Sequence, residues 1–187
     1  MGKLNVYNFI TLNGFFKGPK EDISWAKHGT EEEQEYAASN LKSGGTLLFG
    51  RVTYKMMASH WPTPEAIKNE PLVAEGMNKA EKIVFSRSLK KAEWNNTRVV
   101  KDNAIEEVKK LKQLPGKDMT VLGSGSIVTQ FAEQGLFDEY QIMVNPIALS
   151  DGTPIFKDIK HNLELKLVST RTFKSGTVLL IYQPMEK

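Results

Sequence analysis

The chain has 187 residues, of which 40% are hydrophobic and 25% are charged, and it contains no cysteine. A chain of this length buries about 70% of the surface that it exposes when unfolded, which favours one well-packed domain over residues 1–187. The lack of cysteine excludes disulfides, thiolate metal sites and a cysteine nucleophile. The 25 basic and 22 acidic residues leave a net charge of +3 without the concentrated basic stripe that is typical of nucleic-acid binding.

Local patterns exclude further classes of protein. The longest apolar runs, such as Thr46–Phe49 and Val178–Tyr182, are far shorter than the roughly 20 residues that cross a bilayer. The N-terminus lacks the charged and apolar regions of a signal peptide. We therefore expect a cytoplasmic protein that binds neither membranes nor nucleic acid. The three histidines lie far apart in the sequence, so we also expect no metal site.

Strand and helix patterns alternate over most of the chain. Alternating or short apolar segments predict strands over Leu4–Leu12, Thr46–Phe49, Lys82–Ser86, Arg98–Lys101 and Met119–Leu122. Helix patterns run from Thr30 to about Ser43, from Arg51 to about Ser59, from Asn103 to Leu114, and from the Gly123–Ser126 turn to Gly135. After Asp138 only strands are predicted, at Tyr140–Val144, Leu163–Phe173 and Thr177–Gln183.

Two helix starts carry a predicted cap. Thr30 with Glu33, and Asn103 with Glu106, have the spacing of a capping box. Strands that alternate with helices imply crossover connections and a mainly parallel sheet, flanked by helices. The closing strands are expected to add antiparallel pairs at one edge of this mixed sheet.

Three strand ends carry residues suited to a phosphorylated cofactor. Ligands of open α/β sheets lie beyond the carboxyl ends of the strands, where a helix N-terminus offers free N–H groups and positive charge. Gly50 and Arg51 lead directly into a helix, Ser86 and Arg87 follow the next strand, and Gly123–Ser126 forms a third junction. The alternative at each is a tight turn with solvated side chains. The third junction also lacks the last glycine of the dinucleotide fingerprint.

The helix that begins near Thr30 has an acidic first turn, with Glu31, Glu32 and Glu33 in succession. Carboxylates suit the positive end of a helix dipole, so a solvated helix start is one interpretation. The other is that one carboxylate faces the ligand cleft and takes part in catalysis.

These segments, in this order, resemble the dihydrofolate-reductase-like superfamily, and within it the branch of the C-terminal reductase domain of bacterial riboflavin biosynthesis. The most specific segments are Gly50–Tyr54 and Gly135–Tyr140. The resemblance also covers Thr11–Phe15, Lys82–Arg87 and Val121–Ser126, and so nearly the whole chain. It implies an α/β sandwich of three layers in a single domain, and a homodimer that covers the exposed strand edges.

The resemblance implies NADPH bound along the sheet edge. The implied cofactor-binding residues are Leu12, Gly18, Gly50, Arg51, Thr53, Ser86, Arg87, Gly123, Ser124, Gly125, Ser126 and Ile127. Ser86 and Arg87 would hold the adenosine 2′-phosphate. Arg51 and Arg87 would place two guanidinium groups near one phosphate, which predicts a preference for NADPH over NADH.

The same resemblance implies a substrate pocket beside the nicotinamide. We expect Asn8, Asn13 and Trp25 to contact the substrate, although Trp25 could equally be a core residue. Folate-reducing members place an acidic residue early in the first helix, and Glu32 is its nearest equivalent, as a catalytic acid.

The leading hypothesis is an NADPH-dependent reductase that transfers hydride to a pterin-like or phosphoribosylamino-pyrimidine substrate. Members of this branch usually have aspartate where this chain has Asn13, and an amide removes the charge and any acid–base role at that position. This departure keeps a second hypothesis open, an NADPH-binding regulatory module without turnover. Steady NADPH oxidation with a pterin or pyrimidine would decide between the two.

Overall fold

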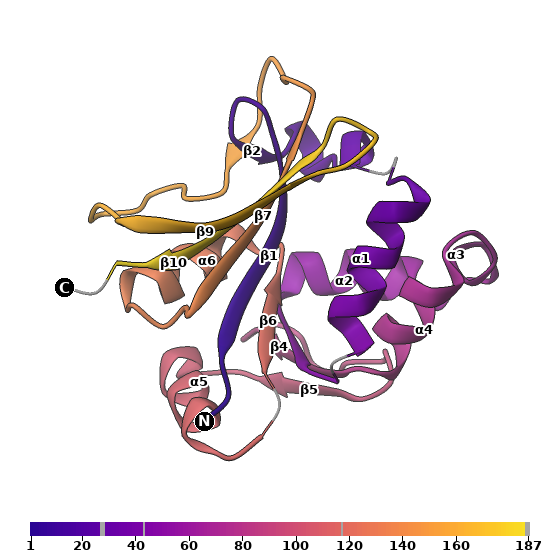
Figure 1. The fold of residues 1–187 in the computed structure, drawn as a ribbon. Helices are drawn as coiled ribbons and strands as arrows, with labels where there is room; N and C mark the ends of the chain where they lie inside the picture. The colour runs from indigo at the N-terminus through magenta and orange to yellow at the C-terminus, as the bar shows by residue number, and fades with distance from the viewer. Residues whose placement is uncertain (27–28, 43, 117, 186–187) are drawn as a thin grey trace.

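The computed structural model describes residues 1–26, 29–42, 44–116 and 118–185. Its centre is an eight-stranded sheet in the order β5-β4-β3-β6-β1-β7-β10-β9 (Figure 1). The strands of this sheet are β1 (Leu4–Thr11), β3 (Thr46–Gly50), β4 (Glu81–Phe85), β5 (Thr97–Val100), β6 (Met119–Leu122), β7 (Glu139–Asn145), β9 (Leu165–Thr172) and β10 (Val178–Pro184). The six strands from β5 to β7 pair in parallel, whereas β10 runs antiparallel to both β7 and β9. The predicted mixed sheet with antiparallel C-terminal strands is confirmed.

Helices cover both faces of the sheet, which gives the expected three layers (Figure 1). The helices are α1 (Glu31–Lys42), α2 (Arg51–His60), α3 (Pro64–Asn69), α4 (Pro71–Lys79), α5 (Ala104–Gln113) and α6 (Gly125–Glu133). Val108 of α5 and Phe131 of α6 pack into one core cluster with Leu4 and Val6 of β1. A second cluster joins α1, α2 and α4 to the strands on the other side, and includes Tyr54 of α2.

The predicted caps have different outcomes. The Glu33 carboxylate accepts a hydrogen bond from the Thr30 backbone N–H at 2.6 Å, which is the returning bond of a capping box. Asn103 does precede α5, but it lies in the left-handed region with φ 57° and its side chain makes no capping bond. The prediction of a capping box at Asn103 and Glu106 is therefore wrong, because the backbone turn aims the amide away from the helix.

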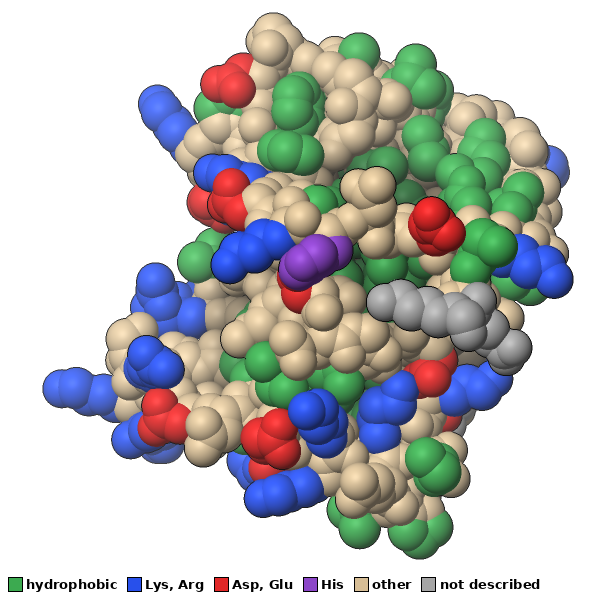
Figure 2. Space-filling model, turned by 90° about the vertical axis from the view of Figure 1, so that its left-hand side faces the viewer, with side chains coloured by type: hydrophobic (Ala, Val, Ile, Leu, Met, Phe, Trp, Pro, Cys, Tyr) green, Lys and Arg blue, Asp and Glu red, His purple; other side chains and the backbone are tan. Residues whose placement is uncertain are grey.

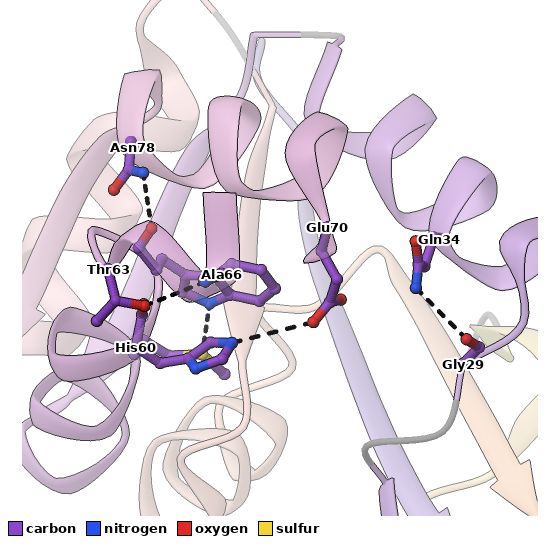
Figure 3. A network of polar contacts seen from close by, with 9 residues as sticks. Gly29, Gln34, His60, Thr63, Ala66, Glu70 and Asn78 are labelled. Atoms are coloured by element: carbon purple, nitrogen blue, oxygen red, sulfur yellow. Dashed lines mark hydrogen bonds and ion pairs between the residues drawn. The ribbon is translucent and has the colours of Figure 1, made fainter. Parts of the chain in front are cut away.

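The segment between α2 and β4 folds into two short helices that the sequence patterns missed. Thr63 caps α3 by accepting the N–H of Ala66 at 3.2 Å, and prolines occupy the first turns of α3 and α4. The Asn78 side chain donates to the Trp61 carbonyl at 2.9 Å and so ties α4 to the end of α2. Figure 3 shows this network, with the His60 ring directed toward the Glu70 carboxylate.

Two short strands were also missed. β2 (Phe15–Lys17) and β8 (Thr153–Pro154) pair with each other in a separate small sheet. β1 contacts β2 directly, so the loop after β1 folds back beside the main sheet. Two 3₁₀ turns, Pro19–Glu21 and Ser24–Ala26, continue the chain from β2 toward α1.

The last hairpin forms one end of the sheet. β9 begins at Leu165, two residues later than predicted, and pairs only with β10. Its side chains are exposed on both faces, and Leu167 and Val168 are 48% and 49% exposed. Figure 2 shows hydrophobic side chains gathered in the upper part of the face that includes this end, whereas Lys and Arg dominate its lower part.

Candidate functional site

The carboxyl ends of the central parallel strands lie at one edge of the sheet and carry the predicted junctions. β3 runs directly into α2 at Gly50, and β6 reaches α6 through Gly123 and Ser124. The Gly50 N–H donates to the Ser124 hydroxyl at 2.8 Å, and the Ser124 N–H donates to the Thr53 hydroxyl at 3.0 Å. The two loops therefore form one connected unit.

Glycine is needed at this unit for space and for backbone conformation. Gly123 has φ +56°, and a Cβ there would lie 3.0 Å from the Thr53 methyl carbon. A Cβ on Gly125 would lie 2.7 Å from the ring of Phe16. Glycine at these two positions thus lets Thr53 and Phe16 pack directly against the backbone of the junction.

The helices that begin at this edge have no side-chain cap. α2 starts after Gly50, α5 after Asn103 and α6 after Ser124, and none of these residues makes a side-chain capping bond. α3, which starts elsewhere, is capped by Thr63. In α6 the Ile127 N–H donates to the Ser124 carbonyl at 2.8 Å, so the first-turn N–H groups without a side-chain cap are those of α2 and those of Gly125 and Ser126. The helix dipoles add partial positive charge at this edge.

A groove of about 500 Å³ continues this edge beyond β4 and β5. Its walls include Ser86 and Arg87 after β4, and Ile127 and Gln130 of α6. Ser86 is fixed, because its N–H donates to the Val100 carbonyl at 2.9 Å and its hydroxyl accepts the Leu89 N–H at 3.0 Å. The Arg87 side chain is exposed, so its guanidinium can reach a ligand in the groove. The structure brings these predicted residues together.

The predicted residues near the end of β1 have varied surroundings. Leu12 is 72% exposed, and its N–H donates to the Ile147 carbonyl at 2.7 Å. Gly18 is buried, and its N–H donates to the Asp22 carbonyl at 2.7 Å. Asn8 is only 3% exposed, and its amide nitrogen has no hydrogen-bond partner among the described residues. A buried donor without a partner costs about 1–3 kcal/mol, so Asn8 is suited to a further acceptor.

Asn13 uses both ends of its amide to join two loops. Its oxygen accepts the Thr11 hydroxyl at 2.8 Å and the Leu149 N–H at 3.2 Å. Its nitrogen donates to the Leu149 carbonyl at 2.8 Å. A carboxylate could accept the first two bonds but could not donate the third. An asparagine at position 13 therefore makes a loop contact that an aspartate could not make in full.

The three neighbouring glutamates of α1 differ in their exposure and in their hydrogen-bond partners. Glu32 accepts hydrogen bonds from the Arg171 guanidinium at 2.8 Å and from the Lys174 N–H at 3.4 Å. The bond from Arg171 is the main reason that the pKa of Glu32 is lowered, so this carboxyl is ionised at neutral pH. Glu33 is buried, and besides Thr30 it accepts the Ser175 hydroxyl at 3.0 Å. Glu31 is exposed.

Aromatic side chains that the sequence patterns did not single out pack together between α1, β1 and the last hairpin. The rings of Tyr7 and Tyr36 lie 6.3 Å apart, and Tyr36 packs against Phe173 at 5.9 Å. The Tyr7 hydroxyl is buried without a partner among the described residues, and burial raises its pKa far above the ordinary value. The Trp25 indole N–H is also buried and unpartnered within that set.

Comparison with known proteins gives the family. The model of the family described as the RibD C-terminal domain matches residues 3–179. The chain belongs to this family. YyaP, an uncharacterized protein of Bacillus subtilis (strain 168), is 34% identical over 173 residues, which cover 92% of this chain and 90% of YyaP.

Solved structures share the fold of this chain. A protein of Shewanella sp. PV-4, named as a candidate riboflavin biosynthesis protein, has a TM-score of 0.77 at 16% identity and covers 98% and 99% of the two chains. A deaminase/5-amino-6-(5-phosphoribosylamino)uracil reductase of Thermotoga maritima has a TM-score of 0.69 at 15% identity, over 98% of this chain and 57% of that one. The dihydrofolate-reductase-like fold that the sequence segments predict is confirmed.

Two absences belong with these findings. In the described ranges no helix is long and apolar enough to cross a membrane. Among the same residues, no three acidic, histidine or cysteine side chains gather as metal ligands would.

Proposed function

We propose that this protein is an NADPH-dependent reductase of a pyrimidine or pterin-like ring. One observation carries the proposal: two helix N-termini without side-chain caps meet at one sheet edge, beside a groove that presents Arg87. Such an edge suits the pyrophosphate and the 2′-phosphate of a dinucleotide. Membership of the RibD C-terminal domain family supports reductase chemistry.

In this proposal the first-turn N–H groups of α2 and α6 hold the pyrophosphate, and Arg87 binds the 2′-phosphate. A reduced nicotinamide supplies the hydride when it is bound there, next to Leu12 and Gly18.

The substrate side of the proposal rests on Asn8, Trp25 and Glu32. Asn8 and Trp25 supply buried donors that have no hydrogen-bond partner among the described residues. Glu32 is ionised by its contact with Arg171, so it can accept a hydrogen bond from a substrate N–H but holds no proton to give. We therefore propose that water delivers the proton and that Glu32 orients the ring.

A second function is favoured by one specific observation. Both polar atoms of Asn13 are engaged in loop contacts, and Glu32 is ion-paired, so neither predicted polar group is free as an acid. A module that binds NADPH and reports its level without turnover would need no acid at all.

The deciding experiment separates binding from turnover. Calorimetric titration of the protein with NADPH and NADH tests the cofactor site, and we expect NADPH to bind more tightly. The reaction is then tested with a panel of substrates, dihydrofolate and phosphoribosylamino-pyrimidines. The loss of NADPH absorbance reports turnover of each one. Equal affinities for the two cofactors would contradict the role of Arg87. Tight binding with no oxidation across the panel would support the regulatory module instead.

A further inference from the structure

Arg87 and Asp102 form an ion pair at the ends of two adjacent strands. β4 and β5 are parallel, with Phe85 opposite Val100, and each of the two charged residues follows its strand at the same distance from that pair. The Arg87 Nε lies 3.2 Å from Asp102 Oδ1, and both residues line the groove. An acidic and a basic side chain thus lie next to each other on the wall of the groove.

The other charges in the groove are arranged differently. Lys109 is paired with Glu106 at 3.1 Å within the first turns of α5. Lys101 lines the groove and makes no ion pair with any described residue. Arg87 uses only its Nε toward Asp102, so the terminal guanidinium nitrogens remain available as donors. Asp102 is the acidic residue that directly faces the arginine expected to bind phosphate.

We propose that Asp102 sets the discrimination between a 2′-phosphate and a 2′-hydroxyl on the adenosine of the cofactor. This inference rests on the proposed function. The Asp102 carboxylate accepts a hydrogen bond from a ribose hydroxyl, while Arg87 binds a phosphate at the same place. The wild-type protein accordingly binds both NADPH and NADH. The ratio of its affinities for the two cofactors is smaller than Arg87 would give without Asp102.

The sign of the effect follows from the charges. A phosphate close to Arg87 is also close to the Asp102 carboxylate, because the ion pair holds the two side chains together. Like charges at that separation repel, and the phosphate must also compete with Asp102 for the guanidinium. The pair is exposed, so solvent limits the effect, and neutral Asn at position 102 should strengthen binding of the phosphorylated ligand about two- to fivefold.

The test uses two ligands that differ in one phosphate, adenosine 2′,5′-bisphosphate and AMP. Calorimetry with wild type, Asp102→Asn, Arg87→Ala and the double variant gives their dissociation constants. Glu81→Gln, at the opposite end of β4, makes the same change in net charge away from the groove and serves as the matched control. Thermal unfolding of each variant checks that the fold is retained.

We expect Asp102→Asn to strengthen binding of the bisphosphate about two- to fivefold. We expect it to weaken AMP binding, because the ribose hydroxyl loses its charged acceptor. The gain for the bisphosphate should be lost in the Arg87→Ala background. The same gain for both ligands, no gain, or an equal gain in Glu81→Gln would overturn the role of Asp102 while leaving the cofactor site in place. If neither ligand binds to the wild type, the cofactor site itself is refuted, and this inference with it.

Discussion

The Thr53 hydroxyl accepts the backbone N–H of Ser124 at 3.0 Å, across two junctions that lie 71 residues apart in the chain. Together with the bond from the Gly50 N–H to the Ser124 hydroxyl, this contact fixes the start of α2 against the start of α6. The separation between the two helix N-termini, and so the spacing of the proposed pyrophosphate donors, depends on these buried bonds.

Replacement of Thr53 by Val should therefore weaken both the fold and the cofactor site. Val keeps the shape of Thr but leaves the Ser124 N–H without an acceptor in a buried place, which costs about 1–3 kcal/mol of unfolding free energy. Urea unfolding and NADPH titration measure the two effects. Thr53→Ser keeps the hydroxyl and should restore both, so an equal loss in the Ser variant would contradict this account.

Replacement of Asn13 by Asp should destabilise the protein, even though aspartate is usual at this position in the branch that the chain resembles. The carboxylate loses the bond to the Leu149 carbonyl and brings a negative charge close to that oxygen. A hydrogen bond of this kind contributes about 0.5–1.5 kcal/mol. Urea unfolding of Asn13→Asp and Asn13→Ala measures the loss. An Asp variant that is as stable as wild type would show that the amide has no structural role.

Glu32→Gln should leave the pH dependence of turnover unchanged between pH 6 and pH 8. The wild-type carboxyl is ionised over that range because its pKa is lowered by Arg171, so its titration cannot shape the profile there. We expect a higher KM, since Gln is a poorer acceptor for a substrate N–H, with little change in kcat. A kcat that falls steeply, with a lost ionisation in the profile, would identify Glu32 as the proton donor after all.

Stability should rise with pH above neutrality because of Lys82. This side chain is 1% exposed, and burial lowers its pKa to about 8 from 10.5. The unfolded chain holds the Lys82 proton up to its own higher pKa, so unfolding takes up a proton between these values and the free energy of unfolding increases with pH. The full difference corresponds to about 3 kcal/mol.

The measurement is urea unfolding at several values between pH 7 and pH 9.5. The range stops short of the point where unfolded tyrosines ionise, since burial raises the pKa of Tyr7 and Tyr140 and their contribution has the opposite sign. Lys82→Met should flatten the rise, whatever its effect on overall stability. Parallel curves for the two proteins would contradict the assignment.

We propose that two copies of the chain associate through the edge formed by β9. This edge strand has one free side and carries exposed Leu167 and Val168, features that proteins usually cover. Sedimentation at micromolar concentration should give the mass of a dimer. The double variant Leu167→Lys, Val168→Lys should sediment as a monomer with unchanged near-ultraviolet dichroism. A monomeric wild type would refute the proposal.

The parallel core could be predicted because its signals are local. The apolar run Thr46–Phe49 is ended by Gly50, and the run Met119–Leu122 is ended by Gly123. α3 and α4 were missed although Thr63-Pro64 and Pro71 are ordinary helix-start signals, and although Val73, Ala74 and Met77 give α4 a buried apolar face. The capping box predicted at Asn103 was wrong because the spacing of Asn103 and Glu106 does not determine the backbone angle of Asn103. That angle is in the left-handed region, and the side chain makes no capping bond.

The residues proposed to hold the cofactor could be placed from the sequence more readily than those proposed to contact the substrate. Its residues follow strand ends directly, so chain order places Gly50, Arg87 and Ser124 at one edge. The partners of Glu32 and Asn13 lie far along the chain, at Arg171 and Leu149, and no local pattern indicates them. Asp102 was overlooked for the same reason, since its importance comes from the neighbouring strand.

The contacts between α1 and the last hairpin affect the order in which the protein can be completed. Glu32 bonds to Arg171 and Glu33 to Ser175, across sequence separations of 139 and 142 residues. During synthesis the proposed phosphate-binding edge can assemble from residues that have already emerged, whereas the contacts of α1 with the hairpin must wait for nearly the entire chain. Contacts of such long range form late and slowly. A nascent chain released early would thus contain the strand ends of the proposed cofactor site but lack the contacts that hold α1 against the sheet.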